Sequence, residues 1–296
     1  MDPPNTGGIK ARMNRFGDNK YVKGGRDFLK SNSLVAKFAF LLLVVILFVL
    51  ILSAGTALLA WLFSPSPNPI LINGMVDAKH MRKFPQDPSA SGAVPILRSV
   101  DDMGGMEFTW SVWIFVEDFL YKQDEYKHVF HKGNYGIQVG EDPPGMSRPN
   151  NAPGLYIAPK TNALVVVMNT FDEIEQSVTI PDLPIAKWVN VIIRLNHQRQ
   201  LDVFINGVLT ERMIMKGVGR QNYDDVYAAL NGGFDGYISS LRYFNSAIGT
   251  NKIQQIVDGG PNMKMDDNTL NQSKPHYLST KWFFTGIGDE YNPKMG

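Results

Sequence analysis

The sequence contains no cysteine among its 296 residues. Disulfides, cysteine-ligated zinc or iron–sulfur sites and thiol catalysis are therefore excluded. Small secreted domains usually need such cross-links, so this fold has to be stabilised by its own core. Hydrophobic residues make up 44% of the chain and aromatic residues 11%, which is enough to build that core.

Charge is absent from residues 38–76. Within this stretch, residues 38–63 read FAFLLLVVILFVLILSAGTALLAWLF, an apolar run long enough to cross a hydrocarbon core of about 30 Å as a helix. A cleaved signal peptide has a shorter apolar region nearer the N-terminus, and a buried helix rarely runs this long without a polar residue. We therefore expect an uncleaved, single-pass membrane anchor, with lipid contacts at Phe38, Leu42, Ile46, Leu50 and Trp61.

Net charge is low as well, +1 at neutral pH, but it is unevenly distributed. Residues 1–37 carry eight Lys or Arg and three Asp, a net charge of +5, so residues 38–296 carry −4. The positive-inside rule then places the N-terminus on the cytoplasmic, inner side of the membrane. The basic tail, residues 1–37, is either an orientation signal attracted to anionic headgroups or a contact for nucleic acid or an acidic partner.

After the anchor, residues 64–93 are rich in proline, which predicts an extended stalk. Residues 94–260 then show the two-residue periodicity of strands, with no interleaved helices, which predicts an antiparallel β-sandwich or jelly roll. The Asn206-Gly207 pair predicts a tight hairpin, and residues 250–260 predict one short flanking helix capped by Thr250. Residues 261–296 form a C-terminal tail. The strands are expected at 107–116, 127–131, 135–140, 154–158, 163–169, 175–180, 188–195, 201–205, 208–214, 226–230 and 234–244.

Three stretches of this domain, taken in their order and spacing, resemble a known pattern. They are FTWSVWIFVED (108–118), WVNVIIRLNHQRQLDVFINGVL (188–209) and FDGYISSLRYFNSAIGTNKIQQIV (234–257). Together they resemble the laminin-G-like, concanavalin A-like lectin/glucanase superfamily of jelly rolls. The resemblance implies one of three activities: glycan binding, glycoside hydrolysis or protein docking.

Hydrolysis requires two carboxylates at a suitable separation. The glucanase branch places them in a Glu-x-Asp-x-x-Glu pattern, which the string EIEQSV, residues 173–178, resembles only in part. Val178 occupies the position of the second catalytic glutamate, although Glu173 and Glu175 match the first pair. We expect no enzymatic activity.

Calcium binding, a feature of several branches, needs clustered oxygen ligands. The candidates are Asp224 and Asp225, with Glu141–Asp142 and Asp172–Glu173 as further acidic pairs, although acidic pairs in loops are most often simply solvated. The family's Asp-Glu after the Phe-x-Gly strand start is replaced by Ser239-Ser240, so we expect no cofactor, with Ca²⁺ as the alternative. His128 and His131 are expected on opposite faces of a strand, which makes them poor joint metal ligands.

Glycan binding uses exposed aromatic side chains for stacking. Tyr223, Tyr227 and Tyr135 are the candidates, as is Trp113, although an aromatic residue of a sandwich more often belongs to the core.

Protein docking is the remaining activity. The tail contains the apolar patch Trp282-Phe283-Phe284, a candidate docking site. The whole plan also resembles membrane proteins of large DNA viruses that infect algae and protists. That resemblance predicts a minor capsid or virion protein that links an internal membrane to capsid proteins; a glycan-binding surface module is the alternative.

The stretch GGFDGYISSLRYFNSAI, residues 232–248, carries apolar side chains on both faces of its expected strand. We interpret it as a strand covered on both sides, in which Gly232, Gly233 and Gly236 let the chain turn and approach a neighbour. It identifies the fold rather than a chemical site.

Overall fold

The computed structural model describes residues 27, 33–62, 64–99, 105–137, 140 and 142–266. The chain divides into two compact units, residues 1–64 and residues 65–296. Most of the basic N-terminal tail lies outside the described residues. The predicted docking residues Trp282, Phe283 and Phe284 also lie outside them.

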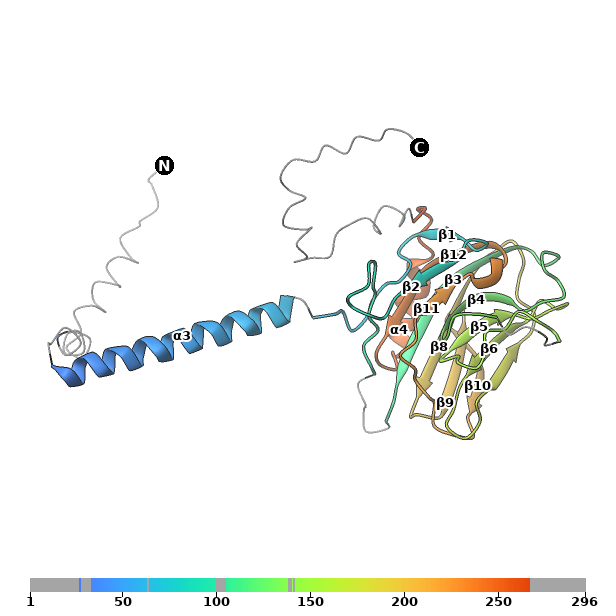
Figure 1. The fold of residues 1–296 in the computed structure, drawn as a ribbon. Coiled ribbons are helices and arrows are strands. Elements are labelled where there is room, and N and C mark those ends of the chain that lie inside the picture. The colour runs from blue at the N-terminus through green and yellow to red at the C-terminus, as the bar shows by residue number, and fades with distance from the viewer. Residues whose placement is uncertain are drawn as a thin grey trace, which may run out of the picture. The chain divides into compact units, whose positions relative to one another are not determined.

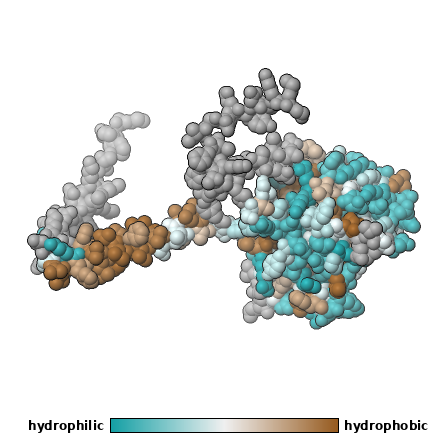
Figure 2. Space-filling view, in the orientation of Figure 1, coloured by the Kyte–Doolittle hydropathy of each residue, from teal (hydrophilic) through white to brown (hydrophobic). Residues whose placement is uncertain are grey.

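In the first unit, helix α3 spans Leu34–Leu62, so it begins four residues before the predicted start. Its side chains form an almost continuous hydrophobic surface (Figure 2). By length and composition this helix could cross a membrane, although a signal sequence near an N-terminus passes the same test. The predicted lipid-facing residues are each at least 48% exposed: Phe38, Leu42, Ile46, Leu50 and Trp61.

The second unit is a sandwich of two six-stranded antiparallel sheets (Figure 1). Sheet A has the order β1 (Met75–Asp77), β12 (Asp235–Phe244), β3 (Phe108–Asp118), β8 (Trp188–Asn196), β9 (Gln200–Ile205) and β10 (Val208–Ile214). Sheet B has the order β2 (Arg82–Phe84), β11 (Val226–Ala228), β4 (Lys127–Lys132), β5 (Gly154–Ile157), β6 (Leu164–Met168) and β7 (Gln176–Ile180). The predicted mainly β, antiparallel sandwich is confirmed.

Residues 70–84 differ from the sequence prediction, which assigned residues 64–93 to a stalk. They form β1, paired with β12 at the edge of sheet A, and β2, paired with β11 at the edge of sheet B. Leu71, Ile72 and Val76 are buried in the core between the sheets. This segment is therefore part of the sandwich, because its apolar side chains find edges that no other strand covers.

Two local predictions are also corrected. Residues 135 and 136 form a bend rather than the start of the predicted strand 135–140, and Gly136 and Gly140 adopt positive φ angles of 120° and 91° that a regular strand does not use. Helix α4, Thr250–Gly259, begins after Gly249, and no side chain caps it. Thr250 is thus the first helical residue rather than the cap.

The core lies between the two sheets and contains most of the buried apolar side chains. At its centre the ring of Trp110 lies 5.2 Å from Phe130 of sheet B and 5.1 Å from Tyr243 of its own sheet, measured between centroids. On the outer face of sheet A, α4 buries Ile253 against Ile192, Phe204 and Phe244. The predicted flanking position of this helix is confirmed.

Strand β12 shows why its glycines matter. It pairs with β1 on one side and β3 on the other, and Ile238, Ser239, Ser240 and Leu241 are all buried. A Cβ atom on Gly236 would lie 1.8 Å from the carbonyl oxygen of Phe115. The expected close approach of this strand to its neighbour is confirmed, as is the Asn206-Gly207 hairpin, whose two φ angles are +49° and +82°.

We expect Gly236→Ala to lower the free energy of unfolding by at least about 2 kcal/mol, because backbone strain at φ 146° adds to a clash with backbone atoms. Gly259→Ala is the matched control, since nothing lies within 4 Å of the added methyl group. Thermal and urea unfolding of the two variants compares them. Equal stability of Gly236→Ala and the parent protein would contradict this account of β12.

Candidate functional site

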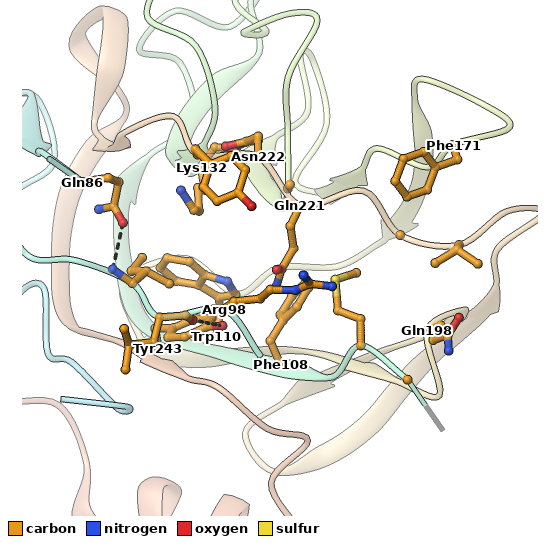
Figure 3. Close-up of a pocket in the computed structure, with 18 of the residues that line it drawn as sticks. Gln86, Arg98, Phe108, Trp110, Lys132, Phe171, Gln198, Gln221, Asn222 and Tyr243 are labelled. Carbon is orange, nitrogen blue, oxygen red and sulfur yellow. Dashed lines mark hydrogen bonds between the residues drawn. The ribbon is translucent and has the colours of Figure 1, made fainter. Parts of the chain in front are cut away.

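A pocket of about 680 Å³ lies between the two sheets at one end of the sandwich (Figure 3). Its walls come from the start of β3, the end of β12 and the last residue of β4, together with the loop that precedes β11 and the turn between β8 and β9. This volume falls within the range of roughly 300–1,000 Å³ that small-molecule sites occupy. The pocket is the candidate functional site.

Aromatic side chains form both the base and the rim of this pocket. Phe108, Trp110 and Tyr243 belong to the buried core and line the base of the pocket. Phe171 and Tyr223 stand on loops and are 73% and 91% exposed. The pocket therefore has buried aromatic rings at its base and exposed aromatic rings at its rim. This arrangement suits a ligand with both apolar and polar faces.

Two cations, Lys132 and Arg98, line the pocket. Figure 3 shows Lys132 and Gln221 on one side of the pocket, opposite Trp110 and Phe108. Burial lowers the pKa of Lys132 to about 8, although Asp224 and Asp225 act to raise it. Its ammonium group donates one hydrogen bond, to the backbone oxygen of Asp224 at 2.5 Å. An ammonium has three donors, and the described residues accept from only one of them.

Amide side chains supply most of the other polar groups. Gln86 is fully engaged: its Nε2 donates to the carbonyl oxygens of Phe84 and Val94, and its Oε1 accepts from the amide of Ile96. The side-chain amide of Gln198 makes no hydrogen bond with any described residue. Trp110 likewise has an indole N–H with no partner among the described residues. Gln86 thus fixes one wall, while Gln198 and Trp110 can bind a ligand.

The three tyrosines predicted to bind glycan lie in different environments. Tyr223 lines the pocket. Tyr135 and Tyr227 do not line it; their rings contact each other with centroids 5.5 Å apart. Tyr227 is buried beneath Tyr135, with Lys83 over its ring at 5.9 Å. Trp113 is also buried and lies on the outer face of sheet A.

The two aspartates proposed as calcium ligands are held by protein groups. Asp225 forms an ion pair with Lys83 at 3.0 Å and accepts a hydrogen bond from the backbone N–H of Gln86 at 2.8 Å. Asp224 accepts a hydrogen bond from Asn150 Nδ2 at 3.0 Å. Within the described ranges, no group of three His, Asp or Glu side chains is arranged to hold a metal ion. The aspartates order the loop that carries Tyr223.

The carboxylates of the partial glucanase motif lie outside the pocket. Glu175 accepts two hydrogen bonds from the guanidinium of Arg148, at 2.6 and 2.9 Å. Glu173 forms an ion pair with Lys216 at 2.6 Å. Both carboxylates serve to join neighbouring loops.

His128 and His131 correct a further prediction. A β-bulge between His128 and Phe130 shifts the register of β4, so the two imidazoles lie on the same face, with Nε2 and Nδ1 only 2.6 Å apart. Because the amide of Leu230 donates to Nδ1 of His128, the Nε2 of His128 carries the proton and donates to His131. His131 in turn donates from Nε2 to the carbonyl oxygen of Asn134. The pair is a neutral structural chain.

Of the residues that line the pocket, only Tyr223 was singled out from the sequence as a candidate for binding. Strand β4 reads KHVFHK and all six residues are buried, so its lysines and histidines are polar groups in an otherwise apolar environment. A polar residue in a strand covered on both sides is the signal that could have indicated Lys132. The loop residues Gln198 and Gln221 carry no such signal, because distant turns bring them together.

Comparisons with known proteins give limited similarity. The receptor-binding domain of botulinum neurotoxin D matches with a TM-score of 0.41 and 12% identity over 55% of this chain and 38% of that one. The botulinum neurotoxin serotype G binding domain matches with a TM-score of 0.38 and 11% identity over 51% of this chain and 36% of that one. The serotype D ligand-binding domain in complex with N-acetylneuraminic acid matches with a TM-score of 0.44 and 12% identity over 63% of this chain and 46% of that one. The chain therefore spans less than half the length of each.

No protein-family model matches the chain, and neither does any curated protein sequence. The sandwich architecture thus rests on the observed sheets, and membership of the laminin-G-like superfamily stays a prediction.

The histidine pair predicts a pH dependence of stability. Burial, reinforced by His131, lowers the pKa of His128 well below its usual value, and burial lowers the pKa of His131 to about 4. The unfolded chain protonates both imidazoles near pH 6.5, while the folded chain keeps them neutral. Stability is therefore complete above pH 6.5 and falls between pH 6.5 and 4, by up to roughly 2–3 kcal/mol per pH unit.

Urea unfolding at a series of pH values measures this slope. The double variant His128→Gln/His131→Gln is expected to flatten it over the same interval. A double variant with the slope of the parent protein would disprove the assignment.

Proposed function

We propose that the sandwich is a non-enzymatic glycan-binding module and that the pocket between its sheets is the binding site. The observation that carries the proposal is the combination, in one pocket of about 680 Å³, of aromatic rings with amide and ammonium groups that still have donors unused by the described residues. A sugar ring offers an apolar face of C–H groups and a rim of hydroxyl groups. It therefore matches a pocket with a dry aromatic base and polar walls.

The rim supports the proposal through its exposed rings. Tyr223 and Phe171 are too exposed to stabilise the core, since they are 91% and 73% accessible. Exposed aromatic rings on ordered loops are costly to leave in water and mark binding sites when they border a pocket. Tyr223 sits next to Asp224 and Asp225, whose hydrogen bonds and ion pair hold the loop in place.

The polar walls supply the hydrogen bonds that sugar hydroxyls require. The amide of Gln198 can both donate and accept, the indole N–H of Trp110 can donate, and Lys132 has two donors that no described residue accepts. Each ligand hydroxyl that meets one of these groups replaces a hydrogen bond to water. Specificity follows because a pocket group left unpaired by the wrong ligand is penalised.

Absence of catalysis is part of this proposal. Glu173 and Glu175 are ion-paired to Lys216 and Arg148 and do not line the pocket. The two glutamates that match the glucanase pattern therefore give no support to hydrolysis at this site. The predicted capsid and virion role, with capsid proteins as partners, stays a prediction that stands beside this one. The orientation of the predicted anchor also stays a prediction.

A glycan array probed with the detergent-solubilised full chain tests the binding function. We expect binding to one glycan class, weakened roughly 3- to 10-fold by Tyr223→Ala through loss of one aromatic contact. Gln198→Ala should weaken binding by a similar factor through loss of its hydrogen bonds. Tyr135→Ala is the matched control, an exposed tyrosine outside the pocket.

Failure of the parent protein to bind any glycan would refute the proposal and favour docking. Equal losses in Tyr223→Ala and Tyr135→Ala would move the site away from the pocket.

A further inference from the structure

A second hollow lies on the outer face of sheet A, between β12, the end of α4 and the following segment Gly260–Lys264. It consists of two adjoining pockets of about 130 and 530 Å³ that share Ser240, Arg242, Gly259 and Gly260. We call this hollow the basic groove. It is separate from the pocket proposed to bind glycan, because the two share no lining residue.

The groove is lined by cations. Arg242, Lys252 and Lys264 all border it, and none of its described lining residues is acidic. None of the three forms an ion pair with a described residue, although lysines elsewhere on the sandwich do, such as Lys79 with Asp235 and Lys83 with Asp225. The uncompensated positive charge favours a multiply charged anion as ligand.

Arg242 gives the sharpest indication of a missing acceptor. Its Nε atom is buried and has no hydrogen-bond partner among the described residues. A buried donor without a partner costs roughly 1–3 kcal/mol, so native proteins rarely leave one. Arg242 lines both parts of the groove, and no nitrogen of its guanidinium donates to a described residue. An oxyanion in the groove would therefore find unused donors there, and a guanidinium is well suited to bind phosphate through two parallel N–H groups.

The groove is also built on rigid elements. The backbone of Arg242 pairs with Ser111 of β3 on one side and is bridged to Ile70 on the other. A register shift between Ser239 and Arg242 marks a bulge, in which Ser240 takes a φ of +52°. Bulges of this kind re-aim side chains at functional sites. Asn262 fixes the opposite wall by donating to the carbonyl oxygen of Asn73 at 2.6 Å.

One feature opposes an anion. Helix α4 ends at Gly259, beside the groove, and the C-terminus of a helix carries roughly half a negative charge. Three full cations outweigh this partial charge several-fold, so the groove remains attractive to anions.

Exposed apolar side chains beside the groove indicate the source of the anion. Met263 lines it and is 59% exposed, and Ile70, the bridge partner of Arg242, is 43% exposed. Met265, bridged to Met75 of β1, is 57% exposed. Cationic pockets bordered by apolar side chains are typical of surfaces that bind anionic lipid headgroups.

We propose that the basic groove binds a phosphate group of an anionic lipid headgroup. Arg242 pairs with the phosphate oxygens, Lys252 and Lys264 neutralise the remaining charge, and Met263, Ile70 and Met265 contact the apolar part of the bilayer surface. The inference does not depend on glycan binding at the other pocket, since it rests on different residues.

Binding of the full chain, in neutral detergent, to two probes tests the proposal. One probe is micelles doped with phosphatidylinositol 4-phosphate, and the other is soluble inositol 1,4,5-trisphosphate. We expect salt-sensitive binding to the doped micelles, weakened at least 10-fold by Arg242→Gln and roughly 3-fold by Lys252→Gln or Lys264→Gln. Lys187→Gln, at an exposed position outside the groove, is the control and should bind as the parent does.

Two outcomes would overturn the proposal: no binding to either probe, or losses in Lys187→Gln equal to those in Arg242→Gln. Binding of the soluble phosphate ester with the same affinity and the same sensitivity to Arg242→Gln would refute the lipid source and assign the groove to a free phosphate ester. Thermal unfolding of each variant separates lost binding from lost structure, and the two lysine variants keep the test valid if Arg242→Gln unfolds.

Discussion

The contact between Trp110, Phe130 and Tyr243 is the interaction on which the rest of the sandwich depends. Ring centroids 5.1 and 5.2 Å apart join β3 and β12 of sheet A to β4 of sheet B. Aromatic contacts of this kind add roughly 0.5–1.5 kcal/mol each to the burial of large apolar surfaces. Because Trp110 and Tyr243 also border the pocket, the same residues set the spacing of the sheets and the base of the proposed glycan site.

The edges of the sandwich explain why residues 70–84 belong to it. Without β1 and β2, the long strand β12 and the short strand β11 would each present an unpaired edge. The same segment brings Ile70 beside Arg242, so closing the edge of sheet A also completes one border of the basic groove. Strand β12 thus contributes both to the stability of sheet A and to the walls of the two proposed binding sites.

Local and periodic features could be predicted from the sequence, whereas features made by distant contacts could not. The Asn206-Gly207 hairpin, the doubly buried β3 and β12 and the helix at 250–259 follow from turn chemistry and side-chain alternation. Strands β1 and β2 were missed because they are short and lie between proline-rich stretches, so they resemble a linker until their partners are known. The bulge that places His128 and His131 on the same face cannot be detected from the side-chain periodicity. The same is true of the arrangement that brings Lys132, Gln198 and Gln221 to one pocket.

Hydroxyl-radical footprinting of the full chain, with and without the glycan that binds it best, tests the central claim most directly. If the pocket between the sheets is the site, the ligand protects Phe171 and Tyr223 from oxidation and leaves Tyr135 unchanged, since all three are exposed in the free protein. Protection of Tyr135 with unaltered oxidation of Phe171 and Tyr223 would contradict the account and place the ligand on the outer face of sheet B.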